Sequence, residues 1–139
     1  MPYETSLVTL NLLSSELEAF LESSGADDES LELTMELAAE KQNGYAYLEP
    51  PFLPWCHEEQ FANLWLQRGN KEKAAKWYRL ALQNRPHSGL ILLGLARSTG
   101  EKKHYEEFLT AWENADGNRP ELAEARAVIA EFETEVEAE

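Results

Sequence analysis

The sequence predicts an all-α protein of about seven helices, arranged as a solenoid of helical hairpins. Three observations lead to this prediction. Apolar residues recur at intervals of three and four along most of the 139-residue chain, which is the period of an amphipathic helix. Several residue types recur at a fixed spacing of 34, as in stacked hairpin repeats. Glycines and prolines fall between the amphipathic segments, where helices end.

Residues 1–44 are expected to form an N-terminal helical hairpin. The first helix would carry an apolar stripe made of Leu7, Leu10, Leu13, Leu17, Phe20 and Leu21. Ser23-Ser24-Gly25 interrupts that helix, and Asp27-Asp28 can cap a second one. The second helix carries apolar residues at helical spacing, namely Leu31, Met35, Ala38 and Ala39.

The second helix of this hairpin also carries a ridge of acidic residues. They lie three and four apart on one face, at Glu29, Glu32, Glu36 and Glu40. Like charges at this spacing repel by a few tenths of a kcal/mol per pair. The simplest interpretation is a solvated face, and the alternative is a contact surface for a cationic partner.

Residues 45–55 join the first hairpin to the repeats and are rich in proline and aromatic residues. Pro50, Pro51 and Pro54 exclude a helix and favour an extended path. The large apolar side chains are expected to pack as an ordered strap between helical layers. An exposed recognition element is the alternative.

Residues 56–120 contain two copies of one pattern. At the offset of 34, Phe61-Ala62 corresponds to Leu95-Ala96, Tyr78 to Trp112, Ala81 to Ala115 and Pro86 to Pro120. Each pair conserves side-chain size. In the first copy, helices are expected over residues 56–68 and 71–84, with Gly69 ending one helix and Asn70 capping the next.

These residues resemble the tetratricopeptide repeat (TPR) family. The first copy has the family's large, small and aromatic residues, its inter-helix glycine and its closing proline: Phe61, Ala62, Trp65, Gly69, Ala74, Tyr78, Ala81 and Pro86. The second copy keeps Leu95, Ala96, Trp112, Ala115 and Pro120. It departs from the pattern because its glycine, Gly100, comes early and Phe108 occupies the position of a small residue. We therefore expect a degenerate second repeat.

The resemblance also implies a binding face. In the family, the first helix of each repeat lines a concave groove that holds peptides or partner segments. Carried over by register, this face comprises Glu59, Asn63, Leu66, Gln67, Leu90, Leu93 and Arg97. The subclass that binds chaperone tails is disfavoured, because Glu59 replaces a lysine and Gly94 an asparagine. The chain also looks like the C-terminal module of larger bacterial TPR proteins.

Residues 121–139 are expected to form a capping helix and an acidic tail. One face of this helix is apolar, with Leu122, Ala125, Val128, Ile129 and Phe132. Solenoids need a terminal helix whose outer side is polar.

Charge is distributed unevenly along the chain, whose net charge is -14. Residues 1–59 carry thirteen acids and one base, residues 60–103 carry two acids and nine bases, and residues 104–139 carry eleven acids and two bases. Neighbouring layers would partly neutralise one another. Nucleic-acid binding is disfavoured because the overall charge repels phosphate.

The sequence offers little for catalysis. Cys56 and His57 are adjacent and lack the paired spacing of a zinc site, and no phosphate-binding loop or nucleophile motif is found. We therefore expect no enzyme activity, metal or cofactor; a metal protein or enzyme using Cys56 and His57 is the least favoured alternative. The lone cysteine and the absence of a secretory or spanning segment favour the cytoplasm.

The resulting prediction is a protein-protein interaction module that binds a peptide or a partner segment, with no nucleic-acid or membrane partner. The alternative within the same class is a module that forms homo-oligomers, such as a homodimer.

Overall fold

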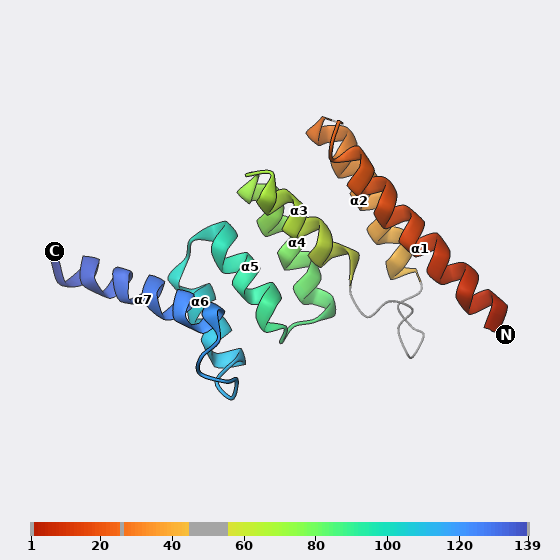
Figure 1. Ribbon diagram of the computed structural model, residues 1–139. Helices are drawn as coiled ribbons and strands as arrows, with labels where there is room; N and C mark the ends of the chain where they lie inside the picture. The colour runs from red at the N-terminus through yellow and green to blue at the C-terminus, as the bar shows by residue number, and fades with distance from the viewer. Residues whose placement is uncertain (1, 26, 45–55, 139) are drawn as a thin grey trace. The chain divides into compact units, whose positions relative to one another are not determined.

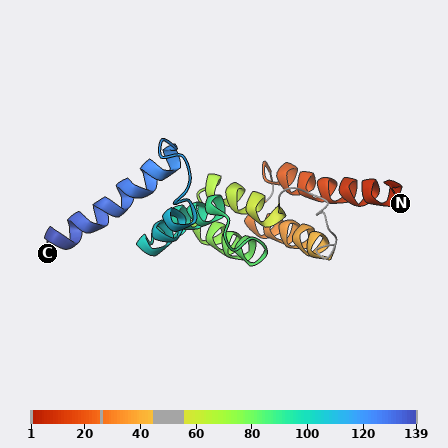
Figure 2. The ribbon, with the colours of Figure 1, turned by 90° about the horizontal axis from the view of Figure 1, so that it is seen from below.

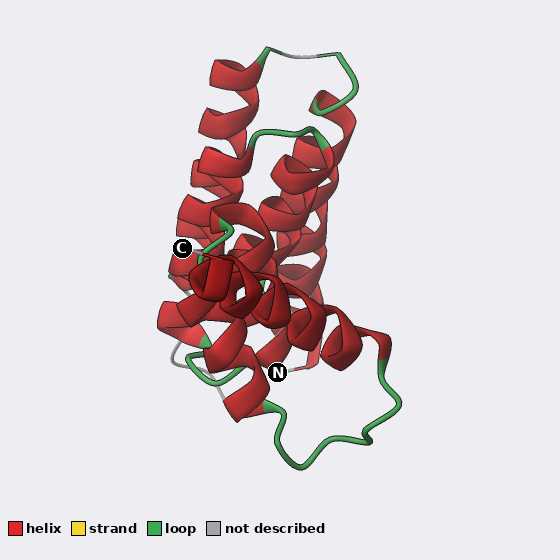
Figure 3. Cartoon of the chain, turned by 90° about the vertical axis from the view of Figure 1, so that its left-hand side faces the viewer, coloured by secondary structure: helices red, strands yellow, loops and turns green. Residues whose placement is uncertain are grey.

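The computed structural model describes residues 2–25, 27–44 and 56–138. Within these ranges the protein has seven α-helices and no strand (Figure 1, Figure 3). The predicted all-α class is therefore confirmed. The helices are α1 (Pro2–Glu22), α2 (Asp28–Asn43), α3 (His57–Gln67), α4 (Lys71–Asn84), α5 (Gly89–Thr99), α6 (Lys102–Ala111) and α7 (Pro120–Ala138). The strap predicted for residues 45–55 lies outside the described residues.

The chain divides into two compact units, residues 1–60 and 61–139. In the first unit, α1 and α2 pack side by side as a hairpin (Figure 2). Asp27 caps α2 as predicted, because its carboxylate accepts a hydrogen bond from the Ser30 backbone N–H at 2.8 Å. Between the helices, the ammonium of Lys41 donates to the Ser15 hydroxyl at 2.9 Å.

The apolar stripe predicted for α1 does not face the core. The residues that α1 buries are instead Leu12, Ser15 and Ala19. They lie on the opposite side of the helix from the predicted stripe, whose described members, Leu10, Leu13, Leu17, Phe20 and Leu21, are all exposed. On this side of α1 the small Ser15 and Ala19 let the two helices approach closely, beside the larger Leu12.

In the second unit, α4 packs on α5, α5 on α6 and α6 on α7. The repeat residues of the first copy lie in its core: Phe61, Ala62, Trp65, Ala74, Tyr78 and Ala81 are all buried. Phe61 meets the Trp77 ring edge-on, with the two ring centroids 5.4 Å apart. Asn70 caps α4 by accepting from the Lys73 backbone N–H at 3.1 Å, as predicted.

The second copy of the repeat differs from the first, as expected from its sequence. α6 has 10 residues where α4 has 14. Trp112 and Ala115 therefore follow α6, and Pro120 is the first residue of α7, a position where its missing N–H leaves no hydrogen bond unmade. Phe108 is fully buried in a cluster with α5 and α7, in which Leu92, Leu93, Ala96, Tyr105, Leu122 and Ala125 also take part. The large Phe108 side chain thus fills the core of a shortened hairpin.

Among the described residues, none of the helices has the length and apolar character needed to cross a membrane.

Candidate interaction face

Tyr78 on α4 contacts both α3 and α5, the two helices that carry the predicted binding residues of the second unit. Its phenol group lies 2.5 Å from the side-chain oxygen of Asn63 on α3, to which it donates a hydrogen bond. The same ring lies against Gly94 on α5, where an added Cβ would come within 2.3 Å of two ring carbons. Because the buried ring of Tyr78 contacts both helices, it forms the base of the surface between α3 and α5.

The exposed apolar part of this face is formed by Leu90. Its side chain is 52% exposed, although α5 is otherwise largely buried. Leu66 on α3 is half-buried and Gln67 is exposed. Leu93, which we expected to contact a partner, is only 1% exposed and belongs to the core. It supports the face from beneath and does not present a contact surface.

Arg97 is the cation of this face, and it already has a partner within the chain. Its Nε and Nη2 atoms donate to the two carboxylate oxygens of Glu124 on α7, at 2.8 and 2.5 Å. These hydrogen bonds lower the pKa of Glu124 and raise the pKa of Arg97. Both side chains remain partly exposed, so a partner carboxylate would have to compete with Glu124 for the guanidinium.

Two features of this face were not identified from the sequence. Glu124 follows Arg97 by 27 residues, and no local pattern links the two positions. Tyr78 was predicted only as a packing residue. Gly94 offers a signal that Tyr78 also contacts α5. Glycine lowers helix stability, so a glycine inside a helix often marks a place where another group approaches the backbone closely.

Glu59, the first predicted residue of the face, belongs to the first unit, whereas the six residues from Asn63 to Arg97 belong to the second. It is half-buried near the start of α3. Next to it, Glu58 is buried and accepts a hydrogen bond from the Asn43 side chain at 3.0 Å. The start of α3 is therefore joined to the end of α2 by a polar contact.

His57 belongs to the same polar contact. Its ring is fully buried, and its Nδ1 atom lies 3.0 Å from a carboxylate oxygen of Glu16 on α1. Its backbone N–H donates to the Gln42 side chain at 2.7 Å. Cys56 beside it is also buried. No group of three or more His, Cys, Asp or Glu in the described part of the chain is placed to hold a metal.

Three basic residues in and just before α4 lie over tryptophan rings. Lys73 and Arg68 lie 5.1 and 5.5 Å from the centre of the Trp65 ring, and Lys76 lies 5.4 Å from that of Trp77. Such cation–π contacts stabilise the folded chain by about 0.5–1 kcal/mol each when exposed. Part of the positive charge of residues 60–103 thus serves packing.

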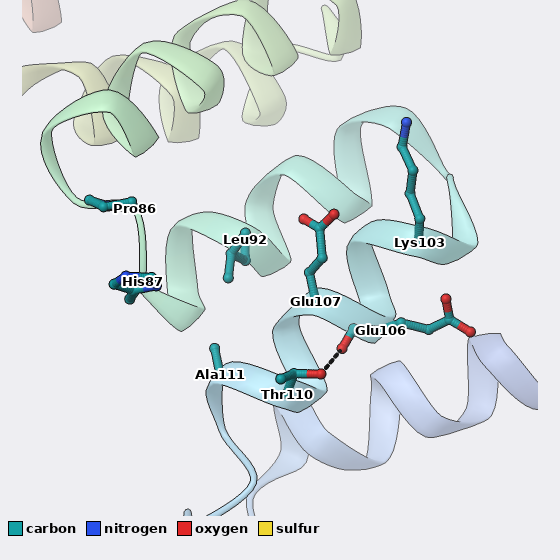
Figure 4. A pocket seen from close by; sticks show the side chains of 8 residues that line it. All are labelled: Pro86, His87, Leu92, Lys103, Glu106, Glu107, Thr110 and Ala111. Carbon is teal, nitrogen blue, oxygen red and sulfur yellow. Dashed lines mark hydrogen bonds between the residues drawn. The ribbon is translucent and has the colours of Figure 1, made fainter.

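An open groove of about 560 Å³ lies beside the α4–α5 connection. Its lining residues are Pro86, His87, Leu92, Lys103, Glu106, Glu107, Thr110 and Ala111 (Figure 4). Lys103, the lysine in this lining, already forms an ion pair with Glu101 at 2.9 Å. Thr110 donates to the Glu106 carbonyl within α6. The lysine and the threonine of the groove are therefore already engaged within the chain.

Comparisons of the chain with protein-family models, with curated proteins and with solved structures gave no match.

Proposed function

We propose that this protein is a non-catalytic, TPR-like interaction module that binds a peptide or partner segment across α3 and α5. The observation that carries the proposal is the double contact of Tyr78 with Asn63 and Gly94. Through these two contacts Tyr78 links α3 to α5, the two helices that carry the binding residues implied by the repeat pattern.

The chemistry of the face suits a peptide with one apolar anchor and one acidic group. Leu90 offers a half-exposed apolar side chain, and Arg97 lies two helical turns further along α5 on the same side. A few apolar contacts near the centre of an interface supply most of its affinity. The guanidinium of Arg97 would select a carboxylate, which competes with Glu124.

The test is a selection of binding peptides from a displayed random library with the full-length protein, followed by affinity measurements. For the selected peptides, Leu90→Glu should weaken binding at least about tenfold, because it places a charge at the apolar anchor. Leu93→Glu is unsuitable, since it would disturb the core.

Leu37→Glu is the matched control. Leu37 on α2 is 58% exposed, close to the exposure of Leu90, and the substitution makes the same change in net charge. The Leu37→Glu variant should bind the selected peptides with the affinity of the wild type. Peptides that bind the Leu90→Glu variant as tightly as the wild type would contradict the proposed face.

A further inference from the structure

α1 exposes a regular apolar seam. Leu10, Leu13, Leu17 and Phe20 are separated by three, four and three residues, which is the a and d spacing of a coiled coil. Each of the four side chains is between about one third and two thirds exposed. Leu21 extends the seam at its C-terminal end and is also exposed.

This seam lies opposite the side of α1 that the chain covers. Leu12, Ser15 and Ala19 are buried, and α2 is the helix against which α1 packs. α1 is thus apolar on two opposite sides, and in the described structure only one of them is covered. A helix that is apolar on two sides is suited to lie between two neighbours.

The flanks of the seam indicate which neighbour fits. In heptad register, the positions beside it are Ser14 and Leu21 on one flank and Thr9 and Glu16 on the other. Glu16 is engaged with His57. Coiled coils choose partners of unlike charge through these flanking positions. Here the flanking positions carry almost no available charge. A second copy of α1 therefore meets little charge repulsion at the seam, and a basic helix would find few carboxylates there to pair with.

We propose that the α1 seam is an interface with a second copy of this chain, formed by packing the two seams against each other. This surface is separate from the face on α3 and α5, so the inference does not depend on the proposed function.

The size of the seam predicts a weak dimer. Five large side chains at about half exposure correspond to on the order of 400 Å² of apolar surface per copy. Two copies would therefore bury on the order of 800 Å² of apolar surface, which is less than the total of about 1,200–2,000 Å² that stable specific interfaces cover. The dimer should dissociate on dilution.

The test is sedimentation equilibrium of the full chain over a dilution series. The wild type should pass from the mass of one chain to twice that mass as its concentration rises. Leu17→Glu should raise the dissociation constant at least about tenfold, because both copies carry the charge into the seam. A wild type that stays monomeric up to about 1 mM, where even an association free energy of only about -4 kcal/mol would give dimer, would overturn the proposal.

Leu33→Glu is the matched control for Leu17→Glu. Both leucines are 58% exposed, and both substitutions add the same charge. Leu33 lies on α2, on the opposite side from the buried Leu31 and Met35. Its variant should dimerise like the wild type, and an equal loss in the two variants would overturn the assignment to α1. Circular dichroism would verify that both variants keep their helices.

The salt dependence of association provides a second readout. Two chains of net charge -14 repel each other, and salt screens this repulsion, with a Debye length of about 10 Å at 0.1 M. Dimerisation through the seam should therefore strengthen as NaCl is raised. Association that weakens with salt would instead indicate contact between the acidic and basic segments of two chains, and would overturn the seam interface.

Discussion

At the scale of single residues, Gly94 shows how one position can decide the packing of several helices. A side chain there would collide with the ring of Tyr78, which cannot easily withdraw because its hydroxyl is bonded to Asn63. The absence of a Cβ is therefore what allows the contact among α3, α4 and α5.

Gly94→Ala is expected to destabilise the protein. Overpacking of this kind costs about 1–3 kcal/mol, which exceeds the gain of up to about 1 kcal/mol in helix propensity. Urea unfolding should show the loss. Gly117→Ala is the control, because a Cβ at Gly117 meets nothing within 4 Å, and its stability should be unchanged. A Gly94→Ala variant as stable as the wild type would contradict the close contact, because it would show that the Tyr78 ring can move away from position 94 at little cost.

His57 is a second residue whose role depends on burial. Its ring is enclosed in the first unit and faces the Glu16 carboxylate. His57→Ala should lower the free energy of unfolding by about 2–4 kcal/mol, because it leaves a cavity and removes the partner of a largely buried carboxylate. Denaturant unfolding measures this loss. The exposed His87 provides the control, since His87→Ala should cost less than about 0.5 kcal/mol.

At the scale of helices, the ion pair of Arg97 and Glu124 joins α5 to α7. The bidentate geometry orients the two side chains toward each other. Because both groups are more than one third exposed, solvent screening limits the contribution of the pair to under about 1 kcal/mol.

The stability that this pair contributes should depend on pH. The folded-state pKa of Glu124 is lowered, so the contribution is present above the ordinary carboxyl pKa of about 4.3 and is lost as pH falls through the lower folded value. Glu124→Gln should therefore lower Tm at pH 7 and make little difference near pH 3. Thermal unfolding at low salt is the measurement, with Glu131→Gln on the exposed side of α7 as control. A Tm difference that is the same at both pH values would contradict the ion pair.

At the scale of the whole molecule, the two units differ in charge and in the way they use their helices. The first unit is strongly acidic and leaves an apolar seam on α1 exposed. The second unit holds the basic segment, part of whose charge lies over tryptophan rings. The two proposed surfaces, the face on α3 and α5 and the seam on α1, involve different helices, so Leu90→Glu and Leu17→Glu test them independently.

The sequence by itself determined the helices of this protein. Their number, both capping residues and the change in the second repeat follow from local patterns, because capping and periodic burial depend on neighbours within about four residues. Asp27 and Asn70 cap the helices that the sequence predicts.

Only the tertiary structure decided which side of each helix is covered. Both sides of α1 carry apolar residues, and α2 covers the side with Leu12, Ser15 and Ala19, where the two small residues allow a close approach. The burial of Leu93 and the pairing of Arg97 with Glu124 likewise depend on α7, whose residues are distant in sequence. Local periodicity shows that a side is apolar, whereas packing against a particular neighbour determines whether that side is core or surface.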